Sequence, residues 1–183
     1  MPDTIKTIET DAFRGTGITE ITIPLNVESM GAITDCHSIT KITVDRENSV
    51  YYSENNCIIE RSTQKLITGA GGNNVVIPDN VKAIGDWAFS GRNNLTSITI
   101  SNSVVEIGKA AFGWSNLSSI SIPSSVILIK AQAFAGCNAL SSVTFENTSG
   151  WKAGDTSISV NTPSQNATWI RQNGIYSNVD WTR

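Results

Sequence analysis

The stretch that decides the fold is VKAIGDWAFSGRNNLTSITI, residues 81–100, because its pattern is written twice more. The copies are VVEIGKAAFGWSNLSSISIP (104–123) and VILIKAQAFAGCNALSSVTF (126–145). Equivalent apolar residues recur every 22 or 23 positions: Val81, Val104 and Val126; Phe89, Phe112 and Phe134; Leu95, Leu117 and Leu140. A fixed period of this length predicts a solenoid, because a single turn cannot bury its apolar residues without its neighbours.

The second half of each copy predicts a β-strand with two different faces. Ile98 and Ile100 are two residues apart and point to one side, whereas Ser97 and Thr99 point to the other. The phrase Leu-x-x-Ile-x-Ile is also the strand signature of leucine-rich repeats. Stacked turns are therefore expected to share one apolar core and to present one face rich in hydroxyl groups.

Each copy also carries an Ala-Phe pair, at Ala88-Phe89, Ala111-Phe112 and Ala133-Phe134. A large ring beside a small residue, once per turn, indicates a column of stacked phenylalanines under the convex wall. We interpret this column as core packing rather than as a cofactor site.

The register extends in both directions to about six turns. The second turn is degenerate, with Ile33 in place of phenylalanine, while Ala12-Phe13 carries the pair in the first. Residues 45–77 are an insertion, in which the apolar segments 57–59 and 65–67 predict a short hairpin. The segment from Gly69 to Asn74 predicts a flexible turn rather than a loop that binds phosphate. The expected strands contain Ile21, Ile42, Val75, Ile98, Ile120 and Val143.

These copies, with the hairpin-containing insertion, resemble the leucine-rich repeats of BspA-like bacterial surface proteins over residues 1–147. The resemblance implies a β-rich leucine-rich-repeat solenoid of the α/β horseshoe class, with about six turns of 22–23 residues. Its expected division is a solenoid at 1–146 and a C-terminal capping segment at 147–183. Arg92 and Trp114 depart from the family, which often has cysteine three residues before the leucine of each copy.

The tail after residue 146 contains no copy of the repeat but holds several large aromatic residues. A helix is expected from Pro163 to about Arg171, ending near Gly174, followed by a closing strand at 175–181. The aromatic residues predict a cap over the last turn; the alternative is an exposed carbohydrate platform made of Trp151, Trp169, Tyr176 and Trp181.

Residues for catalysis or metal binding are few, so we expect neither an enzyme nor a cofactor. The one histidine, His37, follows Cys36, but a Cys-His pair needs an orienting third group. Cys36 and Cys137 occupy equivalent places four turns apart, roughly 19 Å, which is too far for a disulfide. Both cysteines are interpreted as small buried residues.

Charge and hydropathy exclude some classes of partner. The net charge is −3 and the pI about 5.1, so nucleic acid is not an expected partner. No apolar run approaches the roughly 18 residues of a membrane span. Residues 1–5 (MPDTI) match 77–81 (IPDNV), which suggests a fragment whose leader has been removed. The resemblance to BspA-like proteins implies a location at the cell surface or in the extracellular space.

The sequence leaves two functions open. The resemblance implies an adhesion or host-interaction module that binds a protein or extracellular-matrix ligand; the alternative is a spacer without a ligand of its own. Serine and threonine also simply suit a solvated strand. The candidate binding face is the outward side of the strands: Glu20, Thr22, Lys41, Thr43, Ser97, Thr99, Ser119, Ser121, Ser142 and Thr144.

Overall fold

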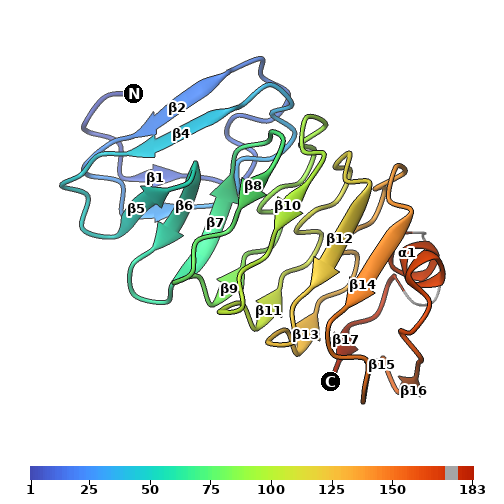
Figure 1. The fold of residues 1–183 in the computed structure, drawn as a ribbon. Coiled ribbons are helices and arrows are strands. Elements are labelled where there is room, and N and C mark those ends of the chain that lie inside the picture. Colours follow the sequence, from blue (N-terminus) through green and yellow to red (C-terminus); the bar gives the residue numbers. More distant parts are fainter. Residues whose placement is uncertain (172–176) are drawn as a thin grey trace.

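The computed structural model describes residues 1–171 and 177–183 and is a β-solenoid of about six turns (Figure 1). Successive turns stack side by side, and the two termini lie at opposite ends of the stack. In the described residues the one α-helix, α1 (Pro163–Arg171), lies in the tail, so the repeats themselves are built from strands and turns. The expected leucine-rich-repeat fold is confirmed.

The predicted strands form a row of parallel pairs along one side of the solenoid. Residues alternate as expected: Ile120 and Ile122 are buried, whereas Ser119 and Ser121 are exposed. The pairs are β2 (Glu20–Ile23) with β4 (Lys41–Val44), β8 (Val75–Val76) with β10 (Ile98–Thr99), and β12 (Ser119–Ile122) with β14 (Ser142–Phe145).

A second sheet, which the sequence did not predict, runs along the other side of each turn. The Val-x-x-Ile segment that opens every copy contributes a strand of two residues, too short to show an alternating pattern. These strands are β9 (Ala83–Ile84), β11 (Glu106–Ile107) and β13 (Leu128–Ile129), with β1 (Thr7–Ile8) and β3 (Ser29–Met30) pairing separately in the first turns.

The insertion adds a meander to this second sheet. The predicted hairpin is confirmed, because β6 (Cys57–Glu60) and β7 (Lys65–Gly69) are antiparallel neighbours. A further strand, β5 (Tyr51–Glu54), pairs with β6, and β7 pairs in parallel with β9 of the next turn. The insertion therefore joins the sheet rather than looping away from it.

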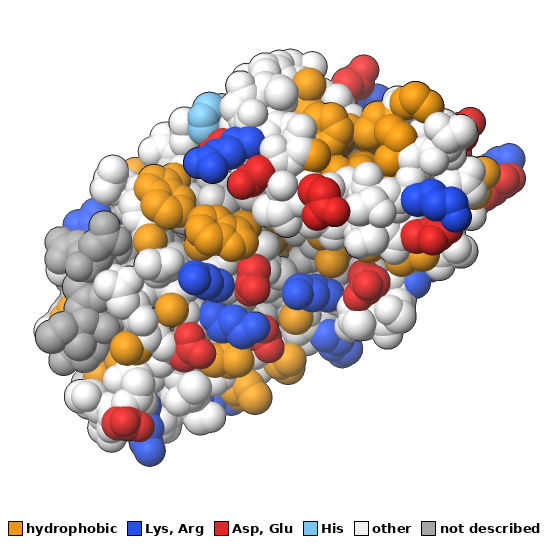
Figure 2. Space-filling model, turned by 180° about the vertical axis from the view of Figure 1, so that it is seen from behind, with side chains coloured by type: hydrophobic (Ala, Val, Ile, Leu, Met, Phe, Trp, Pro, Cys, Tyr) orange, Lys and Arg blue, Asp and Glu red, His pale blue; other side chains and the backbone are white. Residues whose placement is uncertain are grey.

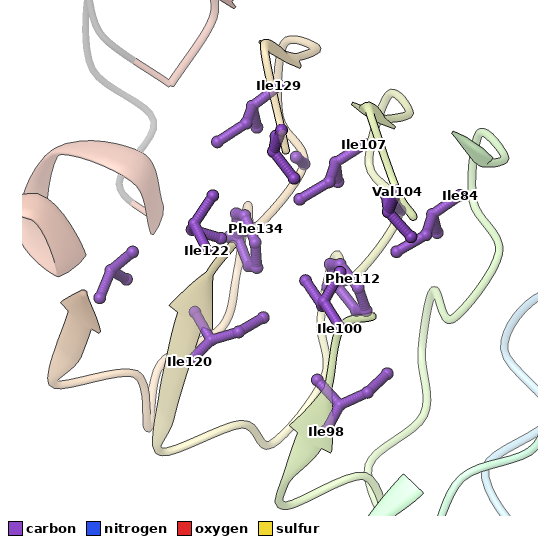
Figure 3. Packing of buried hydrophobic residues seen from close by; sticks show 14 of the residues in the cluster. Ile84, Ile98, Ile100, Val104, Ile107, Phe112, Ile120, Ile122, Ile129 and Phe134 are labelled. Carbon is purple, nitrogen blue, oxygen red and sulfur yellow. The ribbon is translucent and has the colours of Figure 1, made fainter. Parts of the chain in front are cut away.

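The phenylalanine column is confirmed as the centre of the core. Phe112 lies between Phe89 and Phe134, with ring centroids 5.5 and 5.1 Å apart and interplanar angles of 12° and 17°. All three rings are fully buried. Figure 3 shows Phe112 and Phe134 surrounded by isoleucines of both sheets: Ile98, Ile100, Ile120 and Ile122 from the strand row, and Ile107 and Ile129 from the second sheet.

Three residues after the aromatic position, small polar side chains join neighbouring turns (Thr16, Cys36, Ser115 and Cys137), and one turn has Arg92 there. The thiols of Cys36 and Cys137 are buried, as predicted, and donate to the carbonyl oxygens of Phe13 and Phe112 at 2.9 and 3.0 Å. The prediction that Trp114 occupies this buried column is wrong. Its turn has one residue fewer between phenylalanine and leucine, so Ser115 takes the buried place and Trp114 is 50% exposed.

The tail packs on the last turn. Trp151 and Trp181 are buried, and both rings contact Phe145, at centroid distances of 4.9 and 6.0 Å. Asn166 of α1 donates to the carbonyl oxygen of Val143 at 2.9 Å. An exposed platform that includes Trp151 and Trp181 is therefore excluded. The boundary at residue 146 stays a prediction.

The end of the tail differs from its prediction. Helix α1 has the expected bounds, and Gly174, Ile175 and Tyr176 lie outside the described residues. The closing strand is only β17 (Trp181–Thr182), beside β15 (Lys152–Ala153), which pairs with β16 (Thr156–Ser157). Residues 177–179, which were expected to belong to this strand, form a turn and a bend. Next to them, the side chain of Asp180 accepts a hydrogen bond from the backbone N–H of Ala131 at 2.8 Å.

Stability is expected to fall as the pH rises above 9, because burial raises the pKa of the Cys57 thiol from 9.0 to about 12. A raised thiol pKa stabilises the fold fully below the unfolded value, and this contribution is lost as the pH approaches the folded value. Urea titrations from pH 9 to 10 should show a shallower decline for Cys57→Ala than for the unmodified chain. Equal slopes would contradict this account.

Candidate binding face

The ten predicted face residues fall on two strips of the strand row. The first strip, on β2 and β4, carries Glu20, Thr22, Lys41 and Thr43. The second, formed by β10 with the residue before it, β12 and β14, carries Ser97, Thr99, Ser119, Ser121, Ser142 and Thr144. Seven of the ten side chains are exposed, and Thr43, Ser97 and Ser142 are half-buried.

On the first strip the polar groups are directed toward each other. Lys41 Nζ lies 3.4 Å from Glu20 Oε2, and the hydroxyl oxygens of Thr22 and Thr43 are 2.8 Å apart. Both charged side chains are more than 60% exposed, so this ion pair adds little to stability. The first strip is therefore a flat surface with its hydrogen bonds largely satisfied.

The second strip is a regular array of short hydroxyl side chains. Ser119 lies opposite Ser142 in the register, and Ser121 lies opposite Thr144. Thr99 lies opposite Val76, which is 46% exposed. Sequence reasoning missed Val76, although its position directly after the inward-pointing Val75 was a sufficient signal. Val76 supplies a large, exposed apolar side chain beside this array.

Between the strips the insertion opens a polar hollow of about 600 Å³. The second edge of β4 is not paired with another described strand, and instead its backbone donates to the side chains of Asn56 and Ser53 at 3.3 and 3.0 Å. The hollow lies next to the outward side of β8, since both Val75 and Val76 line it. Its other lining residues are Thr40, Asn55, Asn56, Ala70, Gly71, Gly72, Asn73 and Asn74.

The groups with catalytic chemistry are dispersed. Cys36 is buried, whereas His37 is exposed, with its Nδ1 2.5 Å from the carbonyl oxygen of Gly91. Within residues 1–171 and 177–183, no three His, Cys, Asp or Glu side chains come together as metal ligands would. In the same residues no helix has the length and apolarity needed to cross a membrane.

Comparison with known proteins identifies the family. A profile described as "BspA type Leucine rich repeat region" matches residues 1–68 and 68–159, in six copies. No curated protein matches the sequence significantly.

Solved structures with similar folds come from several bacteria. A leucine-rich repeat protein from Eubacterium ventriosum is 26% identical, with a TM-score of 0.69, over 79% of this chain and 41% of its own. A leucine rich cell surface protein from Faecalibacterium prausnitzii is 23% identical, with a TM-score of 0.50, over 81% and 53%. The pneumococcal vaccine antigen PcpA is 17% identical, with a TM-score of 0.61, over 78% and 43%.

The present chain therefore spans about half the length, or less, of these solved proteins. Repeats of this type commonly mediate protein interaction, and the proteins that carry them are generally non-enzymatic scaffolds. Since the profile covers most of the chain and the strand row and core follow its period, the chain belongs to the BspA-type leucine-rich repeat proteins.

Proposed function

We propose that this chain is a non-enzymatic binding module that holds a protein ligand on the second strip and the adjoining hollow. The observation that carries the proposal is the combination of a rigid row of exposed hydroxyls with the exposed Val76 beside a polar hollow. Adhesion to a host or extracellular-matrix protein, with the chain outside the cell, is the role that family analogy supports.

Binding at the second strip has a low entropic cost. Short Ser and Thr side chains lose little rotamer freedom on binding, and the sheet fixes their spacing along the stack at about 4.8 Å. The backbone of a ligand strand has donors and acceptors that such a row can match. Because the strip lacks Trp, Tyr and Arg, binding energy has to come from Val76 and from side chains that enter the hollow.

A spacer role is the second candidate, and the first strip favours it. Its two pairs, Glu20–Lys41 and Thr22–Thr43, satisfy each other across neighbouring turns without a ligand. A spacer needs this kind of self-contained surface. The two candidate functions differ in whether a change on the surface of the second strip weakens the binding of a protein ligand.

The test places two carboxylates on the second strip, with Thr99→Glu and Ser121→Glu combined. Binding to immobilised fibronectin and laminin, measured by surface plasmon resonance, should weaken at least about tenfold, since an unmatched charge at an interface costs several kcal/mol. The matched control is Val105→Glu with Ile127→Glu, two exposed residues away from the strip, and it should bind normally. Equal binding by both variants would favour the spacer.

A further inference from the structure

Two places beside the aromatic position take a left-handed backbone: two residues before it in four turns, and two residues after it in five. The later place is glycine in three turns, Gly15, Gly91 and Gly136, with φ near 70°. In the other two turns it holds Asp35, at 49°, and Trp114, at 55°. Such a φ costs a non-glycine residue roughly 1–2 kcal/mol, so the turn itself does not explain these side chains.

The earlier place holds Ala110 in one turn and larger residues in three, Asp11, Trp87 and Gln132. Trp87 adopts φ 61° there, and Asp11 adopts 67° in the first turn. Asp11, Asp35, Trp87 and Trp114 come from four different turns, yet all four line one cleft of about 540 Å³. Apart from Gln132, the large or charged residues at these two places thus converge on a single hollow.

One wall of the cleft is aromatic. The rings of Trp87 and Trp114 are parallel within 3°, and their centroids are 6.2 Å apart. Trp114 is half exposed, and the neighbouring backbone at Gly136 leaves no room for a β-carbon beneath its ring. Figure 2 shows, on this face, hydrophobic patches next to a group of acidic and basic side chains, with His37 (pale blue) close by.

The opposite wall is polar and already ordered. Arg14 Nε donates to Asp35 Oδ2 at 2.9 Å, and Arg14 Nη1 lies 3.7 Å from Asp11 Oδ2. The hydroxyl of Thr34 donates to Asp11, and Ser90 completes the lining. These contacts hold the charged groups in place and still leave carboxylate lone pairs and guanidinium N–H groups directed to solvent.

A flat apolar wall facing fixed donors and acceptors matches a sugar ring, which has an apolar C–H face and a rim of hydroxyl groups. The cleft volume lies in the range of small-molecule sites, about 300–1,000 Å³. Indole faces also attract cations, and Asp11 and Asp35 together outnumber Arg14 by one charge; both carboxylates are, however, already paired with Arg14, which weakens their attraction for a cationic ligand. A neutral ligand fits both walls.

We propose that this cleft binds a neutral oligosaccharide, with a pyranose ring against Trp87 and Trp114 and its hydroxyl groups bonded to Asp11, Arg14 and Asp35. The cleft shares no residue with the strand row, so this activity is independent of the proposed protein binding. Either site can fail without the other.

The test measures binding of cellohexaose, mannohexaose and chitohexaose by calorimetry and tryptophan fluorescence. Trp114→Gly changes the aromatic wall and Asp35→Gly changes the polar wall. Both variants insert glycine, the residue that three other turns carry two residues after the aromatic position. At least one sugar should bind saturably, and its affinity should fall about tenfold or more in each variant. Gln132→Gly, which changes a left-handed residue outside the cleft, is the matched control and should bind as the unmodified chain does.

Three results would overturn the proposal. None of the three sugars binds at millimolar concentration; or a sugar binds with the same affinity to Trp114→Gly and Asp35→Gly as to the control; or a trilysine peptide binds in the cleft and the sugars do not. Thermal melts of each variant show that it is folded before its affinity is compared.

Discussion

Replacing Phe112 with alanine is expected to lower the free energy of unfolding by about 3–5 kcal/mol. The ring is fully buried and has a stacked ring on each side, so its removal opens a cavity in the middle of the column. Neighbouring turns cannot close this cavity, because two sheets hold them at a fixed spacing. Urea denaturation followed by circular dichroism measures the loss.

The matched control is Phe13→Ala, the same substitution at the equivalent place in the first turn. Phe13 is only half-buried, so its replacement should lose clearly less stability than that of Phe112. A loss below about 1 kcal/mol for Phe112→Ala would be incompatible with a packed column.

The second large effect is expected at Arg92, the most buried charged residue that the structure describes. Its guanidinium donates to the carbonyl oxygens of Ile33 and Gly69 at 2.5 and 2.9 Å. Burial lowers its pKa from 12.5 to about 10, so it stays charged at neutral pH. Replacing Arg92 with alanine leaves at least these two buried acceptors unpaired, each at about 1–3 kcal/mol, which predicts a loss of roughly 2–6 kcal/mol.

Arg92 also connects two separate hydrophobic clusters. One cluster includes Ile33 and Cys36 of the early turns, and the other contains the phenylalanine column. Without the guanidinium, hydrogen exchange should show the first turns opening at lower free energy than the rest. Arg92→Lys should not restore stability, because an ammonium lacks the planar fork. Arg46→Ala, at an exposed arginine, is the control and should change little; equal losses at both sites would contradict this role.

The repeat period was enough to predict the strand row, the phenylalanine column and the number of turns. These features depend on residues that recur in every copy, so each copy supports the interpretation of the others. The insertion was also recognisable, since two short apolar segments around residues 61–64 predict a hairpin without reference to the rest of the fold.

What the sequence did not reveal depends on local exceptions and on distant contacts. Trp114 was assigned to the buried column because its turn has one residue fewer between phenylalanine and leucine. The structure shows on which side of Trp114 the residue is missing, since Ser115 is the buried one. Arg92 was recognised as a departure, but its acceptors lie up to 59 residues away in the chain. The cleft combines Asp11 with Trp87 and Trp114, and the repeat register alone does not show that these side chains meet.

The candidate binding face was likewise predictable in part. Alternation along the strands placed all ten residues on the outward side, and it could have added Val76. The hollow between the strips was not predictable, since it arises where the insertion leaves the edge of β4 without a paired strand and side chains of Ser53 and Asn56 accept its backbone hydrogen bonds.

The central claim is that the repeated residues exist to join turn to turn, which leaves function to side chains outside the repeat pattern. Nuclear Overhauser spectroscopy of the chain with labelled phenylalanine tests it most directly. We predict cross-peaks between the rings of Phe89 and Phe112 and between those of Phe112 and Phe134, whose centroids lie 5.5 and 5.1 Å apart, and none between Phe89 and Phe134. Absence of both neighbouring cross-peaks in the folded chain would contradict the stacked solenoid.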